Sequence, residues 1–188
     1  MVVAIIIIVA LIVLLALIYI GARNSIIRLR NQCDEAWSGI DVQLKRRHDL
    51  VPNLVESVKG YAAHEKSTFE EVTRARAAAM QASGPAEASK AETQLTQALG
   101  GLRVVAEQYP ELRATENFQQ LQGELTDTED KIAAARRYYN SVVQNYNSAI
   151  QSFPALLYAG MFGFRAREYF QAQDSERATP QVSTTPAQ

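Results

Sequence analysis

Few residues of this chain could carry out chemistry, and the pair His64-Glu65 is the first to consider. A zinc protease of the His-Glu-x-x-His type would need a second histidine at position 68, which is Thr68. The other histidine, His48, and the lone cysteine, Cys33, do not complete a ligand set, because zinc sites use three or four protein ligands. The simpler interpretation is a polar pair on a helix surface or between helices. We therefore expect neither a metal nor a cofactor.

Two charged groups suggest binding sites but have simpler interpretations. Lys45-Arg46-Arg47 precedes His48-Asp49, where a helix is expected to end, and basic side chains favour the negative carboxyl-terminal pole of a helix. The acidic residues between Glu124 and Asp130, followed by Lys131, indicate a solvated helix face, because calcium binding needs a loop. Five polar residues beside apolar stripes form either a buried ion-pair network or solvated positions: Asp41, Arg47, Arg76, Arg136 and Asn140.

The composition argues against several classes of protein. The 188 residues include 19 basic and 20 acidic side chains, and the net charge of -1 provides no positive field to hold nucleic acid. None of the nine glycines belongs to a glycine-rich phosphate loop, so the usual fingerprints of an NTPase or a dehydrogenase are missing. We therefore expect a protein that is not an enzyme and does not bind nucleic acid.

The elements that must position the remaining residues begin with a membrane span. No ionisable side chain occurs from Met1 to Ala22, and a run of about 20 apolar residues is long enough to cross a hydrocarbon core of ~30 Å as a helix. A cleaved signal peptide is disfavoured because the run is too long and no basic side chain precedes it. We predict a transmembrane anchor over residues 1–22, with Tyr19 at the membrane interface. Its apolar positions include Val2, Ile8, Leu14 and Ile20.

The basic residues after the span predict its orientation. Arg23, Arg28 and Arg30 precede the first acidic residue, Asp34. The positive-inside rule then places the amino terminus outside and the carboxyl-terminal part in the cytoplasm, with the anchor in the cell (inner) membrane. The alternative is an extracytoplasmic helical part.

Beyond the anchor, apolar residues recur at intervals of three and four up to about Phe153, which indicates helices and no strands. The first helix should end near Arg47-His48, and a second should begin at Asp49 with Pro52 in its first turn. Further helices are expected over roughly 86–109 and 115–153. Long helices with short connections predict an all-α fold, in which an N-terminal transmembrane helix is followed by an antiparallel up-down four-helix bundle over residues 23–170.

Periodicity also selects the residues expected in the core of this bundle. They are Trp37, Leu44, Leu54, Tyr61, Leu99, Leu102, Tyr139, Tyr146 and Phe153. Gly100-Gly101 lies inside the third expected helix, where glycine costs about 1 kcal/mol relative to alanine. Either a neighbouring helix approaches closely at this dipeptide or the helix is locally broken.

The chain ends in an aromatic segment, 157–170, and a polar tail. The aromatic segment either folds back on the bundle, binds another protein, or lies at the membrane surface with Arg165 and Arg167. Residues 171–188 are rich in Gln, Ser, Thr and Pro and contain no aromatic residue, so we expect them to be disordered.

Several motifs follow one another along the chain: the stretch Asp41–Val55, Tyr61-Ala62-Ala63-His64-Glu65, Tyr109-Pro110-Glu111-Leu112, Ala135-Arg136-Arg137-Tyr138-Tyr139-Asn140, Tyr146-Asn147 and Phe153-Pro154. In this order and at this spacing they resemble the LemA family of bacterial membrane proteins. The resemblance implies an amino-terminal membrane helix followed by an antiparallel helical bundle. It implies no enzymatic activity, and its context is membrane proteases and envelope stress.

The function expected from these observations is that of a non-enzymatic, membrane-anchored helical scaffold or adaptor, in envelope or membrane-protein quality control. Its partners would be the lipid bilayer and other membrane or cytoplasmic proteins. The alternative is a homo-oligomer that organises or remodels membrane, because the alanine-rich stretch Ala75–Ala82 allows close helix packing.

Overall fold

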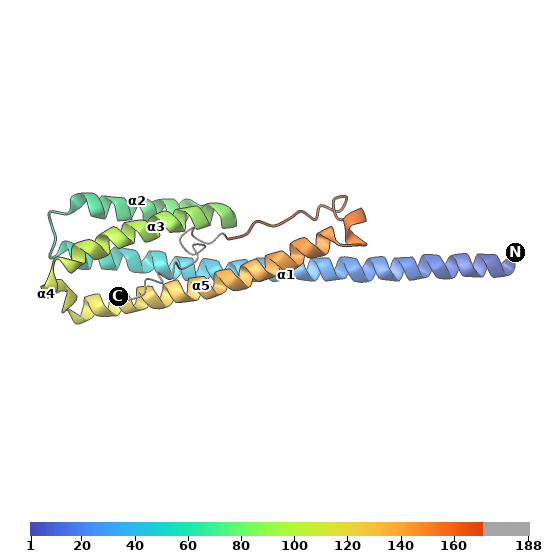
Figure 1. Ribbon diagram of the computed structural model, residues 1–188, viewed down its shortest axis with the longest axis horizontal. Coiled ribbons are helices and arrows are strands. Elements are labelled where there is room, and N and C mark those ends of the chain that lie inside the picture. The colour runs from blue at the N-terminus through green and yellow to red at the C-terminus, as the bar shows by residue number, and fades with distance from the viewer. Residues whose placement is uncertain (171–188) are drawn as a thin grey trace, which may run out of the picture. The chain divides into compact units, whose positions relative to one another are not determined.

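The computed structural model describes residues 1–170, and within them helices are the regular elements and no strand occurs. Figure 1 shows their arrangement. The elements are α1 (Val2–Lys59), α2 (Lys66–Gln81), α3 (Gly84–Glu107), α4 (Pro110–Arg113), α5 (Glu116–Gln151) and the 3-10 turn η1 (Ala155–Leu157). The all-helical fold and the absence of strands in this range agree with the prediction. The tail predicted to be disordered, 171–188, lies outside the described residues.

The chain divides into two compact units. The first unit contains Met1–Val51 and Gln120–Tyr169, and therefore most of α1 and α5 together with η1. Of the described residues, the second unit contains Pro52–Gln119 and Phe170, with the last turns of α1 and all of α2, α3 and α4.

The first unit is held together by the apolar stripes of α1 and α5. On α1 the buried residues Ile26, Cys33, Ile40 and Leu44 follow the three-to-four spacing of one helix face. On α5 the buried residues are Ile132, Tyr139, Val142, Val143, Tyr146 and Ile150. The rings of Trp37 and Tyr139 meet with their centres 5.7 Å apart, which joins the two helices directly.

The second unit packs α2 against α3 through small side chains. Phe69, Val72, Ala75 and Ala79 of α2 are buried, as are several alanines and leucines of α3. A Cβ atom added to Gly101 would lie 4.0 Å from Thr68 Cγ2, so the side chain of Thr68 in α2 reaches the backbone of α3. Because α3 continues without interruption through Gly100-Gly101, the alternative of a locally broken helix is wrong.

The predicted helix boundary at Arg47-His48 is wrong, because α1 continues through Pro52 to Lys59. Proline inside a helix removes one backbone hydrogen bond and costs about 3 kcal/mol. The residues around Pro52 offset this cost by burial, since a buried Val or Leu contributes about 1.5–3 kcal/mol. These buried residues are Val51, Leu54, Val55 and Val58. The helix ends instead at Lys59, and directly after it the Tyr61 N–H donates to the carbonyl of Val58 in a tighter turn.

Two residues predicted to lie in the core are exposed. Tyr61 is 44% exposed and Phe153 is 82% exposed. Tyr61 follows the end of α1 and Phe153 follows the end of α5, so the helical period used to predict their burial no longer applies at these positions. Trp37 is half-buried. The other predicted core residues are buried: Leu44, Leu54, Leu99, Leu102, Tyr139 and Tyr146.

Candidate functional site

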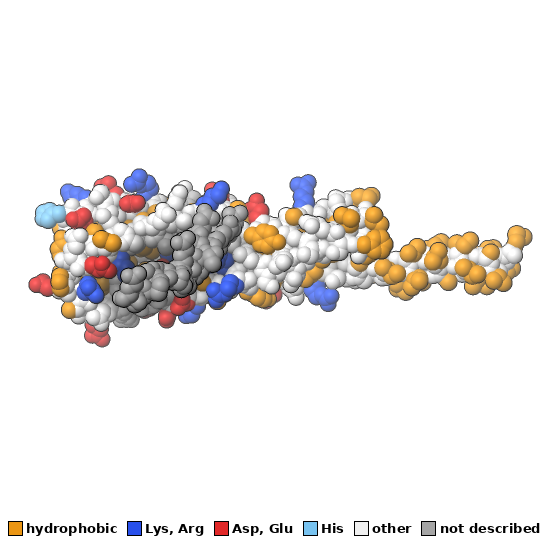
Figure 2. All heavy atoms as spheres, in the orientation of Figure 1, with side chains coloured by type: hydrophobic (Ala, Val, Ile, Leu, Met, Phe, Trp, Pro, Cys, Tyr) orange, Lys and Arg blue, Asp and Glu red, His pale blue; other side chains and the backbone are white. Residues whose placement is uncertain are grey.

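The amino-terminal part of α1 is apolar and has no protein cover. Val2, Ile8, Leu14 and Ile20 all expose about half or more of their side chains. Among residues 1–170, α1 is the one helix that is long and apolar enough to cross a membrane, by its length and composition. Figure 2 shows hydrophobic side chains along this part of α1. Arg23, Arg28 and Arg30 follow on the same helix, and all three are exposed.

Beyond the membrane span, the first unit contains a polar cluster that fastens residues 164–169 to the helices. At its centre is Asn147, near the end of α5. Its Nδ2 donates to the carbonyl of Arg167 at 3.0 Å, and the backbone N–H of Arg167 donates to Asn147 Oδ1 at 2.8 Å. One side-chain amide thereby satisfies both backbone groups of an extended residue, as a neighbouring strand would do. We call this arrangement the Asn147 clamp.

Tyr139 adds a second attachment to the same segment. Its hydroxyl donates to the carbonyl of Glu168 at 2.9 Å. Burial raises the pKa of Tyr139 to about 12, while the nearby guanidinium of Arg167 opposes that rise. The hydroxyl therefore remains protonated, and so able to donate, throughout the physiological range.

Arg167 connects the segment to α1. Its Nη1 lies 2.7 Å from Asp34 Oδ1, in an ion pair whose two side chains are both partly exposed. Such a pair contributes about 0–1 kcal/mol, so its main effect is to fix the direction of the side chain. Phe164, at the start of the segment, is buried. Residues 164–169 thus fold back on α1 and α5, which was one of the alternatives for the aromatic segment.

Cys33 lies within the same polar and aromatic surroundings. Its side chain is fully buried, and burial raises the pKa of the thiol, although the Arg167 charge lowers it in part. A buried, protonated thiol is a poor nucleophile. The site therefore holds a segment of chain in place and presents no activated nucleophile at Cys33.

Arg47 and the pair His64-Glu65 are other polar groups that were singled out from the sequence. Arg47 is buried, and its Nη2 lies 3.0 Å from Glu129 Oε1 on α5. The predicted role of Lys45-Arg46-Arg47 at a helix end is wrong, because α1 does not end there. His64 is exposed and lies with Glu65 in the turn between α1 and α2. Among the residues that the structure describes, no group of three His, Cys, Asp or Glu side chains is placed to hold a metal ion.

The sequence analysis did not identify the residues that form the clamp. Tyr146-Asn147 belonged to the motifs of the family resemblance, but nothing in the sequence indicated the partner of Asn147. Its position beside the buried Tyr146 was the available signal, because a buried amide requires hydrogen-bond partners. Asp34 and Arg167 are far apart in the chain: Asp34 had been considered only as the first acidic residue after the span, and Arg167 only as a residue that could contact the membrane surface.

Most of the chain is similar to one protein family and to named bacterial proteins. The model of the LemA family matches residues 36–183. Protein LemA of Metamycoplasma hominis is 29% identical over 170 residues, covering 88% of this chain and 76% of that protein. Magnetosome protein MamQ 2 of Paramagnetospirillum magneticum is 28% identical over 188 residues, covering 85% of this chain and 69% of that protein. Magnetosome protein MamQ of Magnetospirillum gryphiswaldense is 27% identical over 188 residues, which again cover 85% of this chain and 69% of that protein.

The family match covers α1 from residue 36 onward, the other described helices, and the two residues of the Asn147 clamp. It covers most of the chain. The chain therefore belongs to the LemA family.

Proposed function

We propose that this protein is a non-enzymatic, membrane-anchored helical scaffold that binds other membrane or cytoplasmic proteins. The observation that carries the proposal is the continuity of α1, which runs without a break from the apolar span into both compact units. At 1.5 Å per residue its 58 residues extend about 87 Å. A partner held by the part of α1 that belongs to the first unit would therefore be held at a defined distance from the bilayer.

The relatives support the same class of function. The names of Protein LemA and Magnetosome protein MamQ describe no enzymatic activity, and the second describes a protein of a cellular compartment. The process that we propose is envelope or membrane-protein quality control. We also propose that the long helices form an antiparallel up-down four-helix bundle over residues 23–170; their short connections support this topology. A crystal structure of the full chain in detergent would test the bundle.

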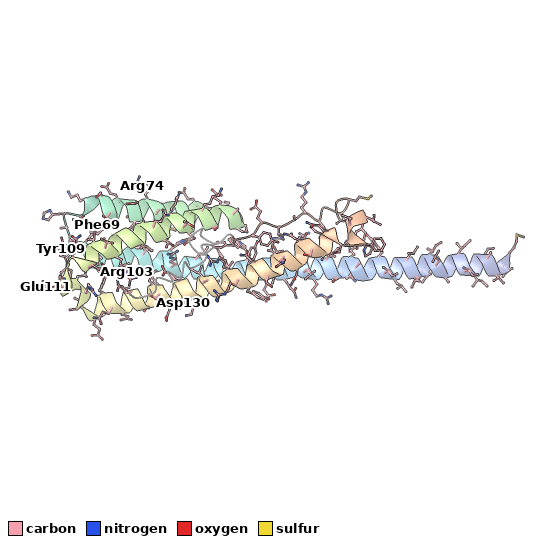
Figure 3. All side chains as sticks on the ribbon, viewed as in Figure 1. Phe69, Arg74, Arg103, Tyr109, Glu111 and Asp130 are labelled. Carbon is pink, nitrogen blue, oxygen red and sulfur yellow. The ribbon has the colours of Figure 1, made fainter. Side chains whose placement is uncertain are left out.

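A groove in the second unit is a suitable surface for a protein partner. It has a volume of about 450 Å³ and lies along α2 beside the last residue of α1. Three of its lining residues are basic, one is acidic and one is aromatic, and the full lining is Lys59, Lys66, Phe69, Glu70, Thr73, Arg74 and Ala77. Figure 3 labels Phe69 and Arg74 on α2. The mixture of apolar and basic groups would suit a partner segment with both apolar and acidic residues.

Site-specific crosslinking in living cells tests the scaffold. A photoreactive amino acid at Ala77, in the groove, should crosslink to a defined second protein, and Arg74→Glu should lower the yield several-fold. The same amino acid at Val104, an exposed position on α3, is the matched control and should give no such product. Equal yields at Ala77 and Val104 would contradict a specific surface on α2.

The second candidate function is a homo-oligomer that organises membrane. The observation that favours it is the exposure of Ala77, Ala78 and Met80 on one side of α2, where another helix could approach closely. Ala75 and Ala79 are already buried within the second unit, so only part of the alanine-rich stretch is available. Crosslinks from Ala77 to the protein's own chain, together with a large defined particle in detergent, would favour this function over the scaffold.

A further inference from the structure

The turn that follows α5 exposes a cluster of large apolar side chains. We call residues 153–163 the aromatic foot; its sequence, Phe-Pro-Ala-Leu-Leu-Tyr-Ala-Gly-Met-Phe-Gly, contains no charged residue. Met161 is 85% exposed and Phe153 is 82% exposed. Leu156, Leu157 and Phe162 also expose more than half of their surfaces. Exposed apolar side chains gathered in one short segment are unusual on a surface that faces water only.

Ring contacts place the foot beside the end of the membrane span. The ring centre of Tyr19 on α1 lies 4.9 Å from that of Tyr158 and 6.0 Å from that of Phe162. Tyr19 lies about 26 Å along the helix from Val2, close to the full ~30 Å of a hydrocarbon core. The foot is therefore at the depth where α1 passes from hydrocarbon to headgroups. In Figure 2 hydrophobic side chains gather beside α1 at the turn after α5.

The foot divides into an inner side that packs on the protein and an outer side that does not. Ala155 and Ala159 are buried and the ring of Tyr158 packs on Tyr19, which anchors the turn to the first unit, while Leu156, Leu157 and Met161 remain exposed. Immediately after the foot, Phe164 is buried and the Asn147 clamp holds Arg167. The foot is thus held at both ends, by α5 and by the clamp, and still exposes most of its large apolar side chains.

Charge distribution along the chain supports the same placement. No Asp, Glu, Lys or Arg occurs between Arg137 and Arg165, so the last part of α5 and the foot are uncharged. Arg165, directly beyond the foot, is exposed, as is Arg23 directly beyond the span. Arginines at the border of an apolar segment can reach lipid phosphates, while aromatic side chains favour the interfacial layer.

From these observations we propose that the aromatic foot is a second membrane contact, inserted into the interfacial layer of the bilayer beside the span. The occupant is lipid because the foot contacts Tyr19 of α1, and the neighbours of Tyr19 in the span, Ile18 and Ile20, are themselves apolar and exposed. Two attachments, the span and the foot, restrain rotation of the first unit about the axis of α1. A span alone would leave this rotation free. The contact goes beyond the scaffold function and does not depend on it.

Spin-label accessibility in the full chain, reconstituted into phosphatidylcholine–phosphatidylglycerol vesicles, tests the proposal. The background is Cys33→Ala, which removes the lone buried cysteine. Labels are attached at Leu157→Cys in the foot, at Leu11→Cys in the span, and at Tyr138→Cys, an exposed position on α5. Collisions with oxygen report on lipid, and collisions with a water-soluble nickel chelate report on water.

The expected result is a several-fold higher ratio of oxygen to nickel accessibility at Leu157→Cys than at Tyr138→Cys, and a ratio at Leu11→Cys that is higher still. Equal ratios at Leu157→Cys and Tyr138→Cys would overturn the proposal, with Leu11→Cys showing that the span itself is inserted. Low accessibility to both reagents at Leu157→Cys, with dipolar broadening between labels, would also overturn it, because a second copy of the chain would then cover the foot.

Discussion

The side-chain amide of Asn147 forms its hydrogen bonds with backbone atoms of Arg167 rather than with another side chain. It exchanges two hydrogen bonds with Arg167, and Tyr139 donates a third to the next carbonyl. Because Asn147 is buried, each bond that it loses leaves a polar group without water to replace it. The attachment of residues 164–169 therefore depends on two side chains of α5.

We expect Asn147→Ala to lower the free energy of unfolding by about 1–3 kcal/mol, because the backbone groups of Arg167 lose their partner. The amide hydrogen of Arg167 should also exchange much faster. Denaturant melts and hydrogen exchange measure the two effects. Asn145→Ala, at an exposed position two residues earlier, is the matched control and should stay within about 0.5 kcal/mol. Equal losses in the two variants would contradict the clamp.

The raised pKa of Tyr139 predicts a pH dependence of stability. The folded state holds the proton up to a pKa of about 12, against an ordinary value of 10, so this contribution is complete below pH 10. It is lost as the pH rises from 10 towards 12, and amounts to at most about 3 kcal/mol. In parallel denaturant melts between pH 10 and pH 12, the free energy of unfolding of Tyr139→Phe should fall less than that of the wild type. Identical slopes would show that the Tyr139 hydroxyl is not buried in the folded state.

At the scale of elements, α1 combines three roles in one helix. Its first part is the apolar span, its middle packs on α5, and its last turns belong to the second unit. A break near Pro52 would separate the second unit from the span. The continuity of α1 therefore depends on burial around a residue that ordinarily disrupts helices.

Pro52→Ala should stabilise the protein by about 1–3 kcal/mol, because alanine restores the missing N–H and is the best helix former. The gain is reduced by the freedom that alanine returns to the unfolded chain. Thermal or denaturant melts measure it. Pro85→Ala, in the first turn of α3 where proline is well tolerated, is the control and should be close to neutral. A loss of stability in Pro52→Ala would indicate that the chain needs a break after Asp49.

At the scale of the whole molecule, orientation decides which partners can reach the helices. Arg23, Arg28 and Arg30 directly follow the span, and by the positive-inside rule they predict a cytoplasmic helical part. The groove along α2 would then meet cytoplasmic proteins or the cytoplasmic parts of membrane proteins. The opposite orientation would limit it to extracytoplasmic partners.

A thiol placed at Met80, an exposed position on α2, tests the orientation. In a Cys33→Ala background, Met80→Cys should react with a membrane-impermeant maleimide only after the cytoplasmic membrane has been permeabilised. Cys33→Ala alone is the control and should not react under either condition. Equal labelling of Met80→Cys in intact and permeabilised cells would place the helical part outside the cytoplasm.

The sequence by itself determined the features that depend on local composition and period. The apolar run, the helices and the resemblance to the LemA family could all be recognised, because each is encoded by neighbouring residues. The ends of the helices were harder to predict from the sequence. Pro52 by itself indicates a boundary, and only the burial of Val51, Leu54 and their neighbours shows that the helix continues.

The tertiary structure alone decided which distant groups meet. Asp34 pairs with Arg167 across most of the chain, and the amide of Asn147 finds its partner in backbone atoms, which have no signature in sequence. The exposure of Tyr61 and Phe153 likewise depends on the residues at which α1 and α5 end. Hydrophobic periodicity reports which face of a helix is apolar, but burial and hydrogen bonding are properties of the contacts that folding creates.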